Sequence, residues 1–163
     1  MLQRDLLPSS SNDPRWAETW QELGHGAPTL AGFARICSLS LASGGERGGK
    51  LSGEARAILY AARERGMIEI KGANQAFDAP SRMLAVHVES TVDQTLIFRS
   101  RENPALTIRF LAGFRELCVA GLAMHHIYQE FSLTRDGLEL AATIPLDEVA
   151  PLLQLATNLG AYE

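Results

Sequence analysis

The 163-residue sequence predicts an α+β protein with helices covering one face of a small, mainly antiparallel sheet of about four strands. Three observations favour this class: apolar residues recur at helical spacing in several segments, other segments alternate apolar and polar residues, and short connections separate the alternating segments. We expect a flexible N-terminus over residues 1–12 and a single domain over 13–163, with a glycine-rich loop at 43–53.

Two or three helices are expected before the first strand. Asp13 and Pro14 have the residue types of a helix cap and first helical position, and this helix should stop at Gly24. A second helix should run from near Thr29 to the glycines, and Ser52 can cap a third.

Strands follow where the apolar period changes to two residues. Met67–Lys71 and Met83–Glu89 both alternate, and Thr95–Arg99 supplies another short strand. The intervening Ser90–Asp93 is a plausible hairpin connection. A fourth strand is expected over about Ala123–Leu133.

Two helices flank this fourth strand. Asn103 and Pro104 predict the start of a long amphipathic helix that ends at Gly121. Thr134 can cap a short helix that Pro145 closes.

A last amphipathic helix is expected from about Val149 to Leu159, and we expect it to take part in self-association. Its side opposite the apolar stripe carries only Gln154 and Asn158 as strongly polar groups, so it is more apolar than one buried face requires. Packing of the helix onto its own sheet is the alternative. The stripe consists of Leu152, Leu153, Ala156 and Leu159.

Composition excludes several classes of protein. Apolar residues make up 46% and charged residues 21%, which is typical of a globular chain rather than a disordered one. The net charge of −4, with cations and anions mixed, offers no broad surface for nucleic acid, although a local patch stays open. No apolar run has transmembrane length and the first residues do not resemble a signal peptide, so we expect a cytoplasmic protein without a membrane partner.

Two pairs of residues are interpreted as packing elements. Cys37 and Cys118 lie among apolar residues, as small buried hydrophobes do in a chain that is not exported. Trp16 and Trp20 lie one helical turn apart and fit core packing, with a partner-facing surface as the alternative.

The glycine-rich loop partly matches the phosphate-binding pattern GxxxxGK[ST]. Gly44, Gly49 and Lys50 fall at its glycine and lysine positions, but Leu51 stands where a hydroxyl should hold magnesium. The residues before Gly44 also look helical, whereas the motif follows a strand. We therefore interpret the segment as a flexible loop and expect no nucleotide cofactor.

No catalytic or metal-binding pattern stands out. His125 and His126 are adjacent and would point to opposite faces of a strand, so with His87 they do not form a ready metal site. No CxxC, HxxxH or GxSxG pattern is present, and we expect no cofactor, no metal and no enzymatic activity. A catalytic site assembled from dispersed residues remains an open alternative.

The stretch Phe114–Ala141 resembles winged-helix transcriptional regulators. It shares with them a helix, the Gly121-Leu122 turn, a strand, and a helix opened by Leu-Thr-x-x-Gly at residues 133–137. The resemblance implies that the helix over residues 104–120 is a recognition helix, with Arg109 and Arg115 contacting DNA.

The sequence as a whole favours a non-enzymatic interaction or regulatory module. It predicts enough helices and strands for a packed core, but it shows no recognisable group of catalytic or metal-binding residues. We expect its partner to be a second copy of the chain, as a homodimer, or another protein. A winged-helix-like DNA-binding regulator is the second hypothesis, and an enzyme with a dispersed site is the third.

Overall fold

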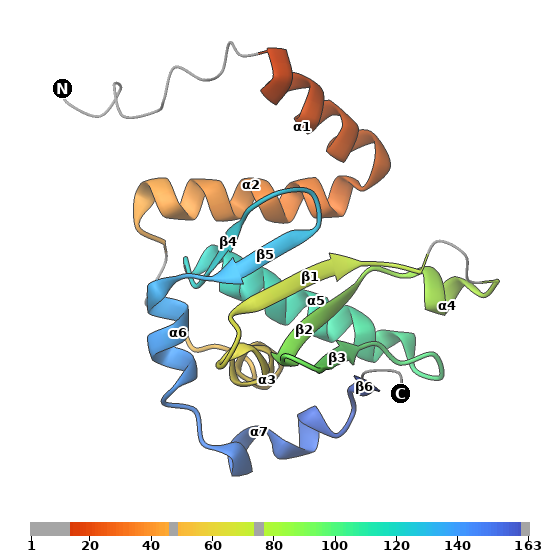
Figure 1. Cartoon of the computed structure of the whole chain (residues 1–163), viewed down its shortest axis with the longest axis vertical. Coiled ribbons are helices and arrows are strands. Elements are labelled where there is room, and N and C mark those ends of the chain that lie inside the picture. The colour runs from red at the N-terminus through yellow and green to blue at the C-terminus, as the bar shows by residue number, and fades with distance from the viewer. Residues whose placement is uncertain (1–13, 46–48, 74–76, 161–163) are drawn as a thin grey trace.

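A computed structural model describes residues 14–45, 49–73 and 77–160. The helices are α1 (Pro14–Gly26), α2 (Pro28–Ser43), α3 (Gly53–Ala62), α4 (Ala79–Arg82), α5 (Pro104–Val119), α6 (Arg135–Ala141) and α7 (Leu146–Leu153). The strands are β1 (Met67–Lys71), β2 (Ala85–Thr91), β3 (Gln94–Phe98), β4 (Ala123–His125), β5 (Glu130–Leu133) and β6 (Thr157–Gly160). Figure 1 shows the strands in front of α3 and α5. The expected α+β class is confirmed.

The strands form one antiparallel sheet in the order β4-β5-β1-β2-β3-β6. Strands β1, β2 and β3 pair with one another in chain order, as their short connections predict. The later strand β5 adds to the free side of β1, and β6 adds to the free side of β3. The sheet therefore has two strands more than the four expected from the sequence.

The inner face of the sheet is apolar because strand residues alternate between the two faces. Ile68 and Ile70 of β1 lie opposite Val88 and Val86 of β2, and all four side chains are buried. The alternation that predicted β1 from the sequence thus places its isoleucines on the side covered by helices.

Phenylalanine rings connect this face to the helices. Phe114 of α5 packs edge-on against Phe33 of α2 and Phe131 of β5, with ring centroids 5.3 and 5.0 Å apart. Further along α5, Phe110 lies 4.5 Å from Phe98 of β3. Aromatic pairs of this kind add about 0.5–1.5 kcal/mol beyond the burial of their area. α5 is therefore the helix that contacts both halves of the sheet.

The helices α3 and α5 approach each other closely at Gly113. A Cβ atom at Gly113 would lie 2.8 Å from the backbone nitrogen of Ala55 and 3.0 Å from the Cβ atom of Glu54. Only glycine fits there without moving one helix.

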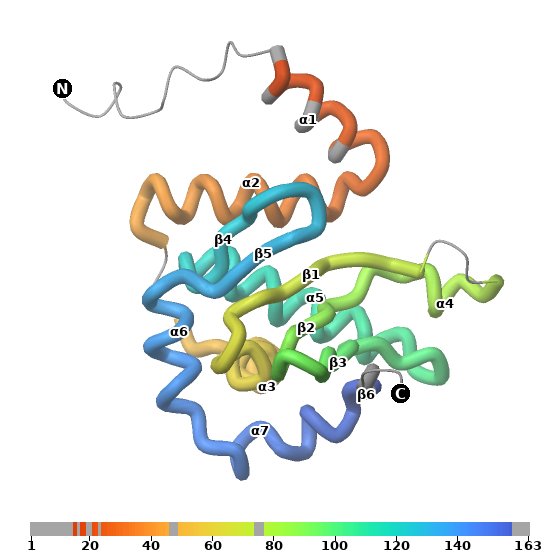
Figure 2. The backbone as a smooth tube through the Cα atoms, viewed as in Figure 1, coloured from red at the N-terminus to blue at the C-terminus, as the bar shows by residue number. Residues whose placement is uncertain are grey.

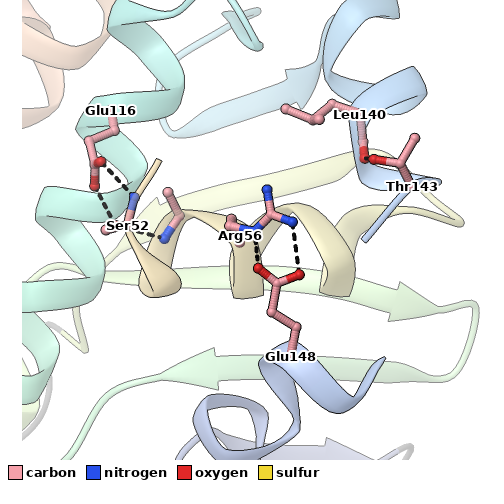
Figure 3. A network of polar contacts seen from close by, with 7 residues as sticks. Ser52, Arg56, Glu116, Leu140, Thr143 and Glu148 are labelled. Atoms are coloured by element: carbon pink, nitrogen blue, oxygen red, sulfur yellow. Dashed lines mark hydrogen bonds and ion pairs between the residues drawn. The ribbon is translucent and has the colours of Figure 1, made fainter. Parts of the chain in front are cut away.

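Polar contacts hold α3 to its neighbours, as Figure 3 shows. The hydroxyl of Ser52 accepts a hydrogen bond from the Ala55 N–H at 3.2 Å, which is the cap predicted from the sequence, and donates to Glu116 of α5. One turn later, Arg56 donates to both carboxylate oxygens of Glu148 on α7, at 2.6 and 2.9 Å. The start of α3 is thus tied to two helices that come much later in the chain.

The segment Ala123–Leu133 is a hairpin of β4 and β5, so its prediction as one strand was wrong. The His126 N–H donates to the Glu130 carbonyl, and the Glu130 N–H donates to the Ile127 carbonyl, both at 2.9 Å. Tyr128 adopts φ 48°, a left-handed conformation that few residues other than glycine take. The turn carries none of the residues that usually mark a hairpin, which is why the sequence did not reveal it.

The helix predicted over Val149–Leu159 ends at Leu153, and the chain then turns into β6. Figure 2 shows the chain running from β5 through α6 and α7. The following strand β6 pairs with β3. Pro151 weakens the helix because proline cannot donate a backbone hydrogen bond, while the outer edge of β3 offers backbone partners. Leu159 consequently lies opposite Thr95 in the sheet rather than on a helical stripe.

Candidate functional site

The outer face of the sheet, turned toward the viewer in Figure 1, is polar and contains a cavity of about 180 Å³. Four adjacent strands supply its walls, so the site exists only once the sheet has formed. We call this cavity the sheet-face pocket. It is lined by Met67, Glu69, Lys71, His87, Glu89, Thr95 and Glu130.

Strand register brings three of these residues into one row. Glu69 of β1 lies opposite Glu130 of β5 on one side and opposite His87 of β2 on the other. Directly opposed residues of antiparallel strands have Cβ atoms about 4.5–5.5 Å apart. Two carboxylates and one imidazole are therefore neighbours although they are distant in the sequence.

His87 is buried at the centre of this row, with 8% of its surface exposed. Burial, and after it the charges of Lys71 and Arg99, lower the pKa of its imidazole to about 4, although Glu69 opposes the change. The ring is therefore neutral at neutral pH. A base with so low a pKa is a poor proton acceptor at that pH, so His87 is better suited to hydrogen bonding than to proton transfer.

The imidazole of His87 has an unsatisfied ring nitrogen in the described structure. Its Nε2 atom is buried and has no hydrogen-bond partner among the described residues. The backbone of Lys71 raises the pKa of the ring and so opposes the lowering effects of burial and of the nearby cations.

The cations near His87 are already engaged. Lys71 Nζ lies 2.6 Å from Glu69 Oε2, which also receives a hydrogen bond from Gln129 at 3.4 Å. Arg99 donates to the backbone carbonyls of Lys71 and Met83 at 3.3 and 3.1 Å. Both cations are therefore already bound to groups of the protein.

The remaining carboxylates give the pocket a negative charge. Glu89 forms an exposed ion pair with Arg65 at 3.4 Å, which solvent weakens. Glu130 is exposed and forms no ion pair within the described part of the chain. Three carboxylates thus line the pocket against the single charge of Lys71.

Both expected DNA-contact residues lie on α5, on the opposite side of the sheet from the pocket. Arg109 and Arg115 are exposed, together with Ala105, Ile108 and Ala112 of the same helix. Arg109 also forms an ion pair with the buried Glu54 of α3. The structure does not bring either arginine to the sheet-face pocket.

The residues expected to mediate self-association lie in two elements. Leu152 and Leu153 of α7, with Ala156 after it, are half-buried and pack against the core of the same chain. Leu159 belongs to β6. Self-association through this region stays a prediction.

The glycine-rich loop follows the end of α2 directly, so a helix stands where the phosphate-binding motif requires a strand. Gly44 takes a left-handed φ of 87° as the C-cap of α2, and Leu51 packs against the core. A second cavity of about 420 Å³ lies beside the described part of this loop. It is lined by Gly49, Leu51, Ala120, Leu122, Asp136, Glu139, Leu140 and Thr143.

His125 and His126 lie at the β4–β5 hairpin, away from His87. His126 Nε2 contacts the Ser132 hydroxyl at 2.7 Å, and His125 Nε2 contacts the Tyr128 carbonyl at 2.8 Å. Among the residues that the structure describes, no group of three or more histidine, cysteine or acidic side chains is arranged to hold a metal ion.

Cys37 and Cys118 are buried free thiols where α2 packs on α5, as expected of small hydrophobes. Burial raises the pKa of Cys118, and its contact with Cys37 raises it further. Both effects disfavour the thiolate, which is the nucleophilic form. The side chains of Trp16 and Trp20 and the N-terminal residues 1–12 lie outside those that the structure describes.

The sequence did not reveal the sheet-face pocket. Of the residues that line it, the sequence pointed only to His87, as a possible metal ligand. Its neighbours Glu69 and Glu130 read as ordinary solvent-facing strand residues, and their proximity depends on β5 pairing with β1 across a long segment.

Comparison of the chain with protein-family models, curated proteins and solved structures finds no match. Within the described ranges, no helix combines the length and apolar character needed to cross a bilayer.

Proposed function

We propose that the protein is a non-enzymatic interaction module and that the outer face of its sheet is the binding surface. The observation that carries the proposal is the sheet-face pocket of about 180 Å³, which four adjacent strands line with the buried His87 and three carboxylates. Concave sites in which a few polar groups converge are the usual places where proteins bind ligands.

Two further features support binding rather than catalysis. The low pKa of His87 makes it a weak base at neutral pH. Lys71 and Arg99 beside it are bound to Glu69 and to backbone carbonyls, so these two cations hold the walls of the pocket in place.

Affinity capture from cells of the native host tests this function. Glu130→Arg and Thr95→Arg place a large cation at the pocket, whereas Glu139→Arg makes the same kind of change on α6. We expect the wild-type and Glu139→Arg proteins to retain the same partner and both pocket variants to lose it. Equal retention by all four proteins would refute the sheet face as the binding surface.

Binding of DNA through α5 is a second candidate, and the β4–β5 hairpin favours it. The wing of a winged-helix regulator needs a hairpin, and the β4–β5 hairpin stands between α5 and α6, where the resemblance implied a strand; α5 also exposes Arg109 and Arg115. Mobility shifts with duplex DNA test it. DNA binding through α5 predicts a salt-dependent shift that Arg115→Ala reduces and Arg135→Ala, on the exposed face of α6, does not.

A further inference from the structure

Two adjoining cavities lie where the segment before α3 meets the end of α5. The larger, of about 420 Å³, extends to α6, and the smaller has a volume of about 140 Å³. Both are lined by Gly49, Leu51 and Ala120, so they share a wall, and we call them together the α5–α6 groove. The larger cavity alone lies within the range of roughly 300–1,000 Å³ that is usual for small-molecule sites.

The floor of the larger cavity is apolar. Leu51, Ala120 and Leu140 are half-buried and pack against the core, and Leu122 is buried. The Thr143 hydroxyl, which also lines this cavity, already donates to the Leu140 carbonyl at 2.7 Å. An aliphatic or aromatic group placed here would leave water for apolar surroundings, which is favourable in proportion to the area removed from water.

Two cations line the smaller cavity. Lys50 and Arg115 are exposed, and neither forms an ion pair with another residue in the described ranges. The charge of Lys50 acts on Glu148, but both oxygens of that carboxylate are already bound by Arg56. Lys50 and Arg115 are therefore available to an anion at this end of the groove.

The carboxylates that line the groove are occupied or lie at its other end. Glu116, in the smaller cavity, accepts two hydrogen bonds from Ser52. With Lys50 and Arg115 it leaves one net positive charge there, which a single negative charge balances. Asp136 and Glu139 of α6 line the larger cavity only, so they repel an anion from the opposite end.

We propose that the α5–α6 groove binds a small apolar monocarboxylate. Its carboxylate contacts Lys50 and Arg115, and its apolar part lies against Leu51, Leu122 and Leu140. The planar guanidinium of arginine matches the two oxygens of a carboxylate. This site is separate from the sheet-face pocket, so the proposal goes beyond the proposed function and does not depend on it.

Isothermal titration calorimetry of the whole chain at neutral pH, with n-octanoate as the probe, tests the proposal. We expect saturable binding, with an affinity that rises from hexanoate to octanoate by up to about fourfold per methylene group. The cation n-octylammonium has the same chain length and should not bind, because Lys50 and Arg115 repel it.

Variants of the two cations test the charged end of the groove. Lys50→Gln and Arg115→Gln should each weaken octanoate binding about threefold or more, which corresponds to loss of one exposed ion pair. Arg35→Gln is the matched control, since Arg35 is exposed on α2 and forms no ion pair among the described residues. It should leave the affinity unchanged.

A bulky side chain at the shared wall tests the apolar part. Gly49→Trp should abolish octanoate binding, and it has room to fold because no atom lies within 4 Å of the added Cβ. Gly32→Trp, at an exposed position of α2 with the same free space, should bind octanoate as the wild type does. Circular dichroism establishes that each variant is folded, and the two cation variants decide if Gly49→Trp is not.

The proposal is wrong if octanoate gives no saturable heat, or if octylammonium binds as tightly as octanoate. It is also wrong if Lys50→Gln and Arg115→Gln behave as Arg35→Gln does, or if a folded Gly49→Trp protein binds octanoate normally. Binding of inorganic phosphate without binding of octanoate would likewise overturn it. None of these outcomes bears on whether the sheet-face variants lose a captured partner, so the proposed function is tested separately.

Discussion

Ser52 and Glu116 bind each other through two hydrogen bonds, from the Ser52 backbone N–H at 2.9 Å and from its hydroxyl. The same hydroxyl accepts from Ala55, so the carboxylate of α5 orients the cap of α3. Glu116→Ala should lower the free energy of unfolding by about 2–3 kcal/mol, because it removes charge-assisted hydrogen bonds at a half-buried site. Urea unfolding followed by circular dichroism measures the loss. Glu139→Ala, at an exposed position of α6, should change stability by less than about 0.5 kcal/mol, and an equal loss in both variants would contradict the role of Glu116.

Gly113→Ala should destabilise the protein by about 1–3 kcal/mol or more, because the added methyl group meets the backbone of α3 at 2.8 Å. Gly32→Ala is a matched control, since it also lies within a helix but has no atom within 4 Å of the new Cβ. That control should gain about 0.5–1 kcal/mol from the better helix propensity of alanine. Thermal unfolding of both variants measures the two effects, and a stable Gly113→Ala protein would show that α3 and α5 can separate at little cost.

Stability should fall as the pH falls from about 6.5 to about 4. The pKa of His87 is about 4 in the folded protein against 6.5 for the free side chain, so the unfolded chain binds the proton more tightly in that interval. The contribution is fully present above pH 6.5 and lost below pH 4, and it amounts to at most about 3 kcal/mol. Urea unfolding across this range, with wild-type and His87→Gln proteins, measures it.

The pH slope between 6.5 and 4 should be shallower for His87→Gln than for the wild type. The assignment to His87 fails if the wild type and His87→Gln have the same slope in this interval.

Cys37 and Cys118 should resist thiol reagents in the native protein, because both are buried and the raised pKa of Cys118 disfavours its thiolate. Both should react fully in urea. Colorimetric titration of free thiols in the two conditions measures the difference. Complete labelling under native conditions, at the rate of a small free thiol, would show that α2 detaches from α5.

We predict a dimer that uses the region of α7 and β6, where Leu146 and Leu155 are exposed by 54% and 46%. Light scattering at tens of micromolar protein should report twice the chain mass, in the range where associations of ordinary affinity are populated. Leu155→Glu should shift the protein toward monomer without unfolding it, since its side chain is largely outside the core. A wild-type monomer at this concentration would remove the prediction.

Local signals explain which elements could be predicted. The alternation of Met67–Lys71 corresponds to β1, and Ser52 caps α3 through its own hydroxyl, because both depend on residues a few positions apart. Tyr128 and β6 escaped prediction for the opposite reason. A left-handed tyrosine has no sequence signature, and Thr157–Gly160 becomes a strand only because β3 offers an open edge.

The site was harder to predict than the fold. Its chemistry depends on Glu130 lying beside Glu69, and these residues meet through pairing between β5 and β1, with α5 between the two strands in the chain. Arg109 and Arg115 were considered because a local motif pointed to them. The spacing of apolar residues along a sequence does not tell which distant strands pair or in which register.

The position of β6 beside β3 has a consequence for biosynthesis. β3 leaves the ribosome well before β6, so during translation the nascent sheet displays an uncovered row of backbone donors and acceptors along β3. Such an edge is a template for pairing with strands of other nascent chains. Ribosome pausing within α5 would prolong this exposure, whereas a chaperone that shields β3 until β6 has been made would favour recovery of the native protein.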